Sequence, residues 1–265
     1  MGPKPPLSDE DIATLSAFAE ELAEVAGEAI RPYFRKTGVG ETRKSHKFDP
    51  VTEADKGAER AIRELIDARY PDHGVLGEEE QEKPGDHLTW VIDPIDGTRA
   101  FITGLPLWGT LIALNDGTRP VIGIMNQPIT GERFLGTPKG AWLNGEALSV
   151  RPCESLEQAI LFSTDPDMFE KEGERAAFER VEAAVRLRRF GGDCYSYCML
   201  AHGLIDLVIE SDLQPYDIQA LIPIVEGAGG IVTSWDGEDA QAGGAVIAAG
   251  DARVHKAALK LLQGK

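Results

Sequence analysis

The sequence is poor in cysteine and in positive charge. Its three cysteines, Cys153, Cys194 and Cys198, are an odd number and have no histidine or cysteine pair near them at the spacing of a zinc site. We interpret them as reduced, buried side chains rather than metal ligands. Lysine and arginine number 27 against 44 aspartates and glutamates, which gives a formal net charge of −17. That charge repels a phosphate backbone and anionic lipid, so it disfavours nucleic acid and membrane as partners.

Long apolar runs are also absent. No apolar run approaches the roughly 20 residues that span a bilayer. The opening residues, "MGPKPPLSDEDIATLSAF", lack the basic region and apolar stretch of a secretory leader. These two absences predict a cytoplasmic protein. The hydrophobic content of 42% in 265 residues is sufficient for a full core, either in one large domain or in two subdomains that pack closely.

The first half of the chain predicts two helices followed by a meandering sheet. Residues 8–34 have the apolar spacing of a long helix with Ser8 as its N-cap, and residues 51–71 predict a second helix with Asp55 near its first turn. A short strand then leads into the acidic loop "GEEE", and "TWVIDPIDG" predicts a strand stopped by Pro94 and Gly97. Further strands with hairpin-like turns follow to residue 150. We assign residues 1–150 to an N-terminal subdomain that carries an antiparallel sheet.

From residue 151 onward, strands and helices alternate. The segments "AILFST", "LRRFG", "IDLVIES", "GIVTSW" and "AVIAAG" predict strands, and "ERAAFERVEAAV", "CYSYCMLAHGL" and "DIQALIPIVEGAG" predict helices before a last C-terminal helix. Alternation of this kind is typical of a more parallel α/β layer. We assign residues 151–265 to a C-terminal α/β subdomain that completes the site.

Four acidic residues stand at the ends of predicted strands: Glu78, Asp93, Asp96 and Asp217. Each alone is better explained by a solvated loop, a helix cap or an aspartate turn than by a functional role. Asp93 and Asp96, however, flank a proline at the end of an apolar strand, where two carboxylates repel each other unless a cation lies between them. Oxygen ligands of this kind suit Mg²⁺.

A metal site built from these carboxylates has a consequence for function. Two such ions about 4 Å apart can hold both the attacking water and the leaving oxygen of a phosphoryl displacement. Bound cations would also offset the repulsion between this acidic protein and a phosphate. The residues therefore predict a hydrolase that acts on a small-molecule phosphate ester.

Four segments follow one another along the chain: "KSHKFDPVTEAD", "GEEE", "WVIDPIDGT" and "LQPYDIQALIPIVEGAGG". In their order and spacing they resemble the signatures of the inositol monophosphatase superfamily of Mg²⁺-dependent, lithium-sensitive phosphatases. The resemblance implies an α/β (α+β) fold, the layered α-β-α-β-α sandwich of the inositol monophosphatase and fructose-bisphosphatase type. It also implies a homodimer with two or three Mg²⁺ ions in each active site.

The same resemblance implies roles for individual residues. Glu78, Asp93 and the carbonyl of Ile95 would bind the first metal, and Asp93, Asp96 and Asp217 the second, while Glu78 with water would reach a weaker third. The attacking water would be positioned and deprotonated by Thr98, oriented by Asp55. The amides of Gly97 and Thr98 would receive phosphate oxygens, Lys44 would lie near the metals, and Glu210 would contact a substrate hydroxyl. From the residues alone, Thr98 is equally well a helix N-cap, and Lys44 is better explained as a solvated loop cation.

Departures from the inositol-specific pattern point to the substrate. Arg99 in "DGTRAF" and Asp193 in "FGGDCYSYC" make the chain resemble the histidinol-phosphate phosphatases of the superfamily, which act in histidine biosynthesis. Asp193 beside Glu210 would complement an ammonium and an imidazole better than a polyol. Alternatively, Asp193 caps the helix that begins near Cys194. Phosphatases of inositol phosphate, fructose bisphosphate or adenosine bisphosphate remain alternatives, as does a non-catalytic metal-dependent binding protein.

Overall fold

A computed structural model describes residues 7–36, 42–43, 50–51 and 53–265. The chain opens with helix α1 (Asp9–Ile30), and its capping box confirms Ser8 as the N-cap: the Asp11 amide donates to the Ser8 hydroxyl while the Asp11 carboxylate accepts from the Ser8 amide. A two-stranded ribbon, β1 (Thr42–Arg43) and β2 (Pro50–Val51), precedes helix α2 (Glu53–Arg69). Asp55 lies in the first turn of α2, as the sequence predicted.

A seven-stranded sheet follows the first two helices, in the order β3-β4-β5-β6-β7-β8-β9. The pair β3–β4 is parallel, and the remaining neighbours pair antiparallel as the meander predicted. A short helix, α3 (Thr98–Thr103), lies between β4 and β5. The strands are β3 (Gly74–Gly77), β4 (Thr89–Asp96), β5 (Gly109–Asn115), β6 (Pro120–Gln127), β7 (Glu132–Thr137), β8 (Gly140–Leu143) and β9 (Glu146–Ala147).

A second, five-stranded sheet is built from later residues, in the order β11-β10-β12-β14-β13. Strand β10 pairs parallel with both β11 and β12, whereas β14 pairs antiparallel with β12 and β13. The parallel character predicted for this half therefore holds for three of its strands only. The bounds are β10 (Ile160–Ser163), β11 (Leu187–Phe190), β12 (Leu207–Leu213), β13 (Ile231–Ser234) and β14 (Gly244–Ala249).

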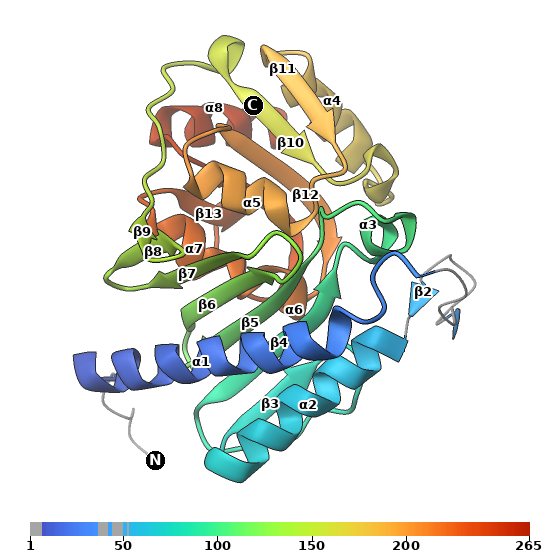
Figure 1. The fold of residues 1–265 in the computed structure, drawn as a ribbon. Helices are drawn as coiled ribbons and strands as arrows, with labels where there is room; N and C mark the ends of the chain where they lie inside the picture. Colours follow the sequence, from blue (N-terminus) through green and yellow to red (C-terminus); the bar gives the residue numbers. More distant parts are fainter. Residues whose placement is uncertain (1–6, 37–41, 44–49, 52) are drawn as a thin grey trace.

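Helices separate and cover the two sheets. Figure 1 shows α1 and α2 on one outer face, α5 (Cys194–Ala201) and α7 (Leu221–Gly227) between the sheets, and α4 (Glu174–Glu182) and α8 (Ala252–Leu262) on the other outer face. The short helix α6 (Pro215–Ile218) precedes α7, and two single 3-10 turns, η1 (Leu156–Gln158) and η2 (Pro166–Met168), flank β10. The described elements thus form the α-β-α-β-α sandwich that the sequence predicted.

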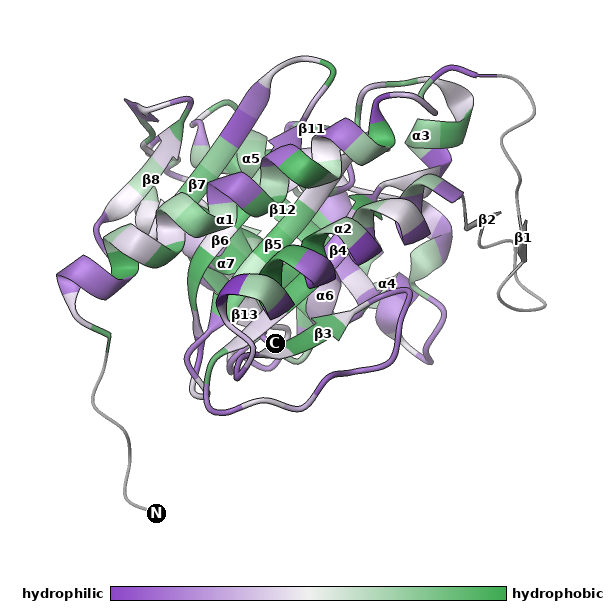
Figure 2. Cartoon of the chain, turned by 60° about the horizontal axis from the view of Figure 1, so that its bottom comes forward, coloured by the Kyte–Doolittle hydropathy of each residue, from purple (hydrophilic) through white to green (hydrophobic). Residues whose placement is uncertain are grey.

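The hydrophobic residues fill the spaces between these layers. In Figure 2 the central strands β5 and β6 are hydrophobic, whereas α1 and α2 alternate between hydrophobic and hydrophilic turns. Trp90 and Phe134, in the seven-stranded sheet, and Trp108, just before β5, are fully buried, and all three cysteines are free and buried, as predicted. Among the described residues, no helix combines the length and the apolar character needed to cross a membrane.

Two local expectations were wrong. Strand β4 ends at Asp96, immediately before Gly97 as predicted, but Pro94 does not stop it. The register of β4 against β5 shifts between Asp93 and Asp96, and the proline sits at this irregularity, where no ladder N–H is required. The helix predicted from Asp217 onward is divided into α6 and α7. Pro223 has no N–H to continue the first helix, but it is tolerated in the first turn of the second.

Candidate active site

Three aspartates predicted from two separate segments meet in space. One carboxylate oxygen from each of Asp93, Asp96 and Asp217 lies within 4.8 Å of the other two. Asp93 and Asp96 stand at the irregular end of β4, and Asp217 stands in the first turn of α6, so the cluster joins the end of the seven-stranded sheet to the helix that follows the five-stranded sheet's β12. Asp93 is only 2% exposed.

Backbone amides hold these carboxylates in place. The Ile95 amide donates to Asp93 Oδ1 at 3.0 Å, and the Gln214 amide donates to Asp217 Oδ2 at 2.7 Å. The Cys194 amide, at the start of α5, donates to Asp96 Oδ2 at 2.7 Å. Sequence reasoning did not identify this last contact, which anchors the cluster to a third segment of the chain.

The cluster concentrates negative charge in a poorly hydrated place. Burial raises the pKa of Asp93 well above its usual value, and the carboxylates of Glu78, Asp96, Asp217 and Asp55 raise it further. Burial is also the main cause of the raised pKa of Asp96, to which Asp193 and Asp217 add. Buried carboxylates that repel one another, with only oxygen donors among them, fit a hard divalent cation such as Mg²⁺.

Gly97 and Thr98 form the turn that leaves the cluster. Gly97 has φ +85°, and a Cβ added to it would lie 2.8 Å from the Leu107 carbonyl oxygen, so both the turn and the packing require glycine. Gly97 is the N-cap of α3, which corrects the alternative in which Thr98 takes that role. Thr98 instead begins the helix, and its hydroxyl donates to the Ile95 carbonyl at 3.1 Å.

A cavity of about 450 Å³ opens beside this turn. It is strongly acidic, with eight carboxylate side chains and, among the described residues, Arg99 as the one basic side chain in its wall. The carboxylates belong to Glu78, Asp96, Asp165, Asp167, Glu170, Asp193, Asp212 and Asp217. Sequence reasoning missed Asp165, Asp167, Glu170 and Asp212, although the position of Asp165 just after β10, at the end of a strand, was an available signal.

Asp193 lies in the wall of this cavity, next to Gly97. A Cβ added to Gly97 would come within 3.2 Å of the Asp193 Cβ. Asp193 takes the N-cap position of α5, as the alternative expected, but its side chain accepts no hydrogen bond from that helix, so the carboxylate does not serve as a side-chain cap. Burial raises the pKa of Asp193 to about 6; the nearby Arg99 opposes this rise, and Asp165 adds to it.

Arg99 and Lys44 differ in what the structure shows of them. The Arg99 guanidinium pairs with Asp165 at 2.5 Å, which links the start of α3 to the loop after β10, and its side chain is 64% exposed. Lys44 lies outside the described residues.

Glu210, the other residue predicted to contact substrate, lies in β12 and is 3% exposed. One of its oxygens accepts from the Thr164 amide at 3.0 Å and from the Thr164 hydroxyl at 2.5 Å. The other accepts from the Tyr197 hydroxyl at 2.9 Å. Burial raises the pKa of Glu210 to about 7. The structure therefore brings Glu210 to the back of the loop that carries Asp165, and Glu210 is not among the residues that line the cavity.

Comparisons with known proteins identify the family of this chain. The model of the inositol monophosphatase family matches residues 11–264. The chain is 43% identical to the bifunctional phosphatase IMPL2 of Arabidopsis thaliana, over 97% of this chain and 77% of the relative, and 36% identical to a histidinol-phosphatase of Chlorobaculum parvum, over 83% and 85%. Its fold is similar to that of an inositol monophosphatase from Zymomonas mobilis, with a TM-score of 0.86, 41% identity and coverage of 97% and 100%.

The family match spans nearly the whole chain, and both named relatives are phosphatases that exceed 30% identity. The resemblance drawn from the four sequence segments, and the layered fold that it implied, are thereby confirmed. The chain belongs to the inositol monophosphatase family and is a phosphoric monoester hydrolase.

Proposed function

We propose that this phosphatase hydrolyses histidinol phosphate in a Mg²⁺-dependent reaction, as a step of histidine biosynthesis. The observation that carries the substrate proposal is the acidic cavity beside the aspartate cluster, with Asp193 next to Gly97 in its wall. Histidinol phosphate carries an ammonium and an imidazole, which charge-assisted hydrogen bonds to carboxylates would bind. The 36% identity to a histidinol-phosphatase supports the same substrate.

The residues that would hold the metal ions are Glu78, Asp93, Asp96, Asp217 and the carbonyl of Ile95. Divalent ions bound there would lower the pKa of a water molecule and would stabilise charge on the leaving oxygen. The raised pKa values of Asp93 and Asp96 support the assignment, because such groups are stabilised as carboxylates when a cation compensates their charge.

Thr98 and Gly97 would manage the water and the phosphate. The Thr98 hydroxyl lies 3.1 Å from the Ile95 carbonyl, at the edge of the cluster, and Asp55 is a buried carboxylate that interacts electrostatically with Asp93. A free hydroxyl is a weak base, so Thr98 would pass a proton of the water to a carboxylate and orient the attack. The amides of Gly97 and Thr98, at the start of α3, would donate hydrogen bonds to the phosphate oxygens.

The organic part of the substrate would extend toward Asp193. Arg99 forms an ion pair with Asp165. We assign it no contact with the ammonium, because its own positive charge would repel that group. Glu210 would not contact the substrate directly. It would accept hydrogen bonds from Thr164 and so hold the loop that carries Asp165 in the cavity wall. Hydrolysis of inositol 1-phosphate is the second candidate, favoured by the 41% identity and TM-score of 0.86 to an inositol monophosphatase structure.

Steady-state kinetics on both substrates tests the proposal. We expect kcat/KM for histidinol phosphate to exceed that for inositol 1-phosphate by roughly a hundredfold or more, because each charge-assisted bond contributes about 1.5 to 3 kcal/mol. EDTA should abolish turnover, and added Mg²⁺ should restore it. Equal turnover of inositol 1-phosphate would refute the substrate, and full activity after chelation would refute the metal-dependent mechanism. No turnover of any phosphate ester would favour a metal-dependent binding protein.

The homodimer and the cytoplasmic location are further proposals, drawn from the family resemblance and the composition. Sedimentation equilibrium and fractionation of cells that express the protein would test them.

A further inference from the structure

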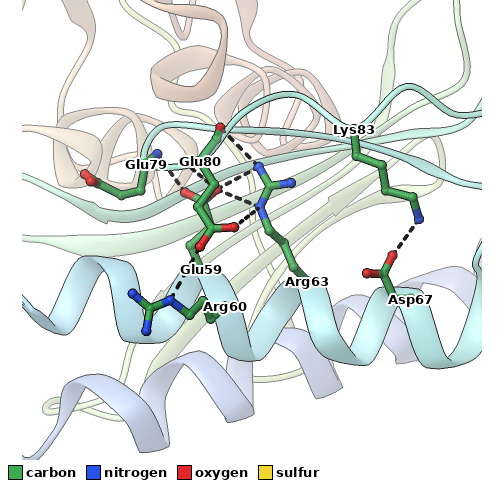
Figure 3. Close-up of polar contacts among 7 residues, drawn as sticks. All are labelled: Glu59, Arg60, Arg63, Asp67, Glu79, Glu80 and Lys83. Atoms are coloured by element: carbon green, nitrogen blue, oxygen red, sulfur yellow. Dashed lines mark hydrogen bonds and ion pairs between the residues drawn. The ribbon is translucent and has the colours of Figure 1, made fainter.

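A fully buried carboxylate lies behind the acidic loop that follows β3. Glu59, on α2, has a side chain that is 0% exposed. Its Oε2 accepts from the Glu79 amide at 2.8 Å and its Oε1 from the Glu80 amide at 3.1 Å. Figure 3 shows this carboxylate reaching from the helix to the loop, with the Arg63 guanidinium alongside. Glu59 is thus bonded to two successive backbone groups directly after Glu78.

The residue before Glu78 is fitted to the same carboxylate. A Cβ added to Gly77 would lie 2.1 Å from Glu59 Oε1, so a side chain at position 77 would displace the glutamate. Glu59 therefore constrains the backbone on both sides of Glu78. One helical turn earlier on α2, four residues before Glu59, stands Asp55, which is 1% exposed and interacts electrostatically with Asp93.

Arg63 balances the charge that this arrangement buries. Its guanidinium pairs with Glu59 at 2.8 Å, from the next turn of α2, and also donates to the Glu80 carbonyl at 3.4 Å. Burying a carboxylate is costly unless it is paired and hydrogen-bonded, and an apolar side chain would fill the same space without that cost. The buried Glu59 carboxylate is explained by its hydrogen bonds to the loop of residues 77–80, which fix the position of that loop.

We infer that Glu59 is a positioning residue for the metal site: it holds the loop of residues 77–80 so that Glu78 faces Asp93. The inference rests on the proposed function, in which Glu78 is a metal ligand. Partners of metal ligands commonly change metal affinity by tenfold to a hundredfold when they are removed. Loss of the Glu59 carboxylate should therefore weaken Mg²⁺ binding, although Glu59 itself touches neither metal nor substrate.

Calorimetric titration of the whole metal-free protein with MgCl₂, without substrate, measures this directly. We expect Glu59→Gln and Glu59→Ala to raise the dissociation constant for Mg²⁺ at least tenfold. The glutamine variant keeps the volume of the side chain but turns an NH₂ group toward an amide or guanidinium donor. At saturating Mg²⁺, Glu59→Gln should regain the wild-type kcat with an unchanged substrate KM, since only the position of the ligand was impaired.

Asp67→Asn is the matched control. Asp67 also joins α2 to the segment after β3, through Lys83 at 2.5 Å, but this ion pair lies further along the helix, away from Glu59 and its contacts with Glu79 and Glu80 (Figure 3). Its dissociation constant for Mg²⁺ should stay within twofold of the wild-type value. If Asp67→Asn weakens binding as much as the Glu59 variants do, any link between helix and loop suffices and the specific role of Glu59 is refuted.

A further variant separates this inference from the proposed function. Glu78→Gln should weaken Mg²⁺ binding at least tenfold; if it does not, the assignment of Glu78 as a ligand fails. If Glu78→Gln weakens binding and the Glu59 variants do not, the positioning role is wrong while the ligand assignment stands. A kcat of Glu59→Gln that stays low at saturating Mg²⁺, or loss of cooperative unfolding in both Glu59 variants, would likewise overturn the inference.

Discussion

Asp193 adopts a backbone conformation that is rare for a residue with a side chain. Its φ is +45° and its ψ −139°, and such geometry costs of order 1 to 3 kcal/mol in a residue other than glycine. Because its side chain makes no bond to α5, the strain is not offset by a helix cap. Strained residues of this kind cluster at active sites and ligand-binding sites.

We therefore predict that Asp193→Asn reduces the preference for histidinol phosphate over inositol 1-phosphate by roughly tenfold or more, since one charge-assisted bond is lost. Asparagine tolerates positive φ as well as aspartate does, so the fold should be kept. Measured kcat/KM ratios for the two substrates give the result.

Asp212→Asn is the control for this prediction. Asp212 also has positive φ, +63°, and lines the same cavity, but its side chain is 63% exposed and faces Lys171 at 3.9 Å. In this variant the ratio of kcat/KM for histidinol phosphate to that for inositol 1-phosphate should change less than twofold. An unchanged ratio in Asp193→Asn would remove Asp193 from substrate recognition.

At the scale of single residues, the sequence was most informative where neighbouring carboxylates repel each other, because few structural arrangements can accommodate such a pair. Asp93 and Asp96, three positions apart, required a common cause, and the structure places them together with Asp217. The environment of Glu210 could not be predicted, because nothing in the sequence shows that Thr164 and Tyr197 donate hydrogen bonds to its carboxylate oxygens. Asp165 and Glu59 were missed, because their partners lie 66 and 20 residues away in the chain.

Among the helices, α8 offers a sharp test of local stability. Its N-cap, Asp251, accepts from the Arg253 amide at 2.9 Å and also from the Cys153 amide at 3.1 Å, so one carboxylate joins the helix to a distant segment. Hydrogen bonds from Arg253 lower the pKa of Asp251 below its usual value.

We predict that Asp251→Ala lowers the free energy of unfolding by about 1 to 2 kcal/mol at pH 7, the usual loss for an N-cap. Because the pKa of Asp251 is lowered in the folded protein, its contribution is present above the unfolded pKa, near 4, and is lost as the pH falls through the folded value. Urea unfolding of the variant and the wild type should therefore show a difference that shrinks below pH 4. The same loss in Asp236→Ala, an exposed turn residue, would contradict the capping explanation.

Helices and strands could be predicted from the sequence where the spacing of apolar residues was regular. The apolar spacing of residues 8–34 and the Ser8 cap specified α1, and the turns specified the antiparallel meander. The continuation of β4 through Pro94 and the separation of α6 from α7 could not be read in this way. Both features depend on whether the position that the proline occupies needs a backbone N–H as a hydrogen-bond donor. The register of the neighbouring segments decides this.

Across the whole molecule, negative charge accumulates around one cavity, beside the ends of β4 and β12. The net charge is −17, and eight carboxylate side chains line one cavity. The layered fold brings Asp93 and Asp96 from β4 toward Asp217 of α6. The folded state therefore confines charges that the unfolded chain separates, and its stability should depend on what compensates them.

The last prediction concerns this dependence in the absence of metal. Burial raises the pKa of Asp193 to about 6 and that of Glu210 to about 7, and the pKa values of Asp93 and Asp96 are raised in the same direction. Between about pH 4 and pH 7 the folded protein thus binds more protons than the unfolded chain. Each extra proton lowers the free energy of unfolding by about 1.4 kcal/mol per pH unit as the pH rises. In EDTA, stability should therefore fall from pH 5.5 to pH 7.5.

Saturating Mg²⁺ should flatten or reverse that slope, because the ions replace protons as the compensating charge and bind better as the carboxylates ionise. Urea unfolding at pH 5.5, 6.5 and 7.5, with EDTA and with Mg²⁺, measures both slopes. Glu210→Gln, which removes one titrating group outside the aspartate cluster, should reduce the slope in EDTA and leave the effect of Mg²⁺ intact. If the stability of the metal-free protein instead rises with pH through this range, the buried carboxylates are already compensated within the fold, and the need for a cation at the aspartate cluster loses its electrostatic basis.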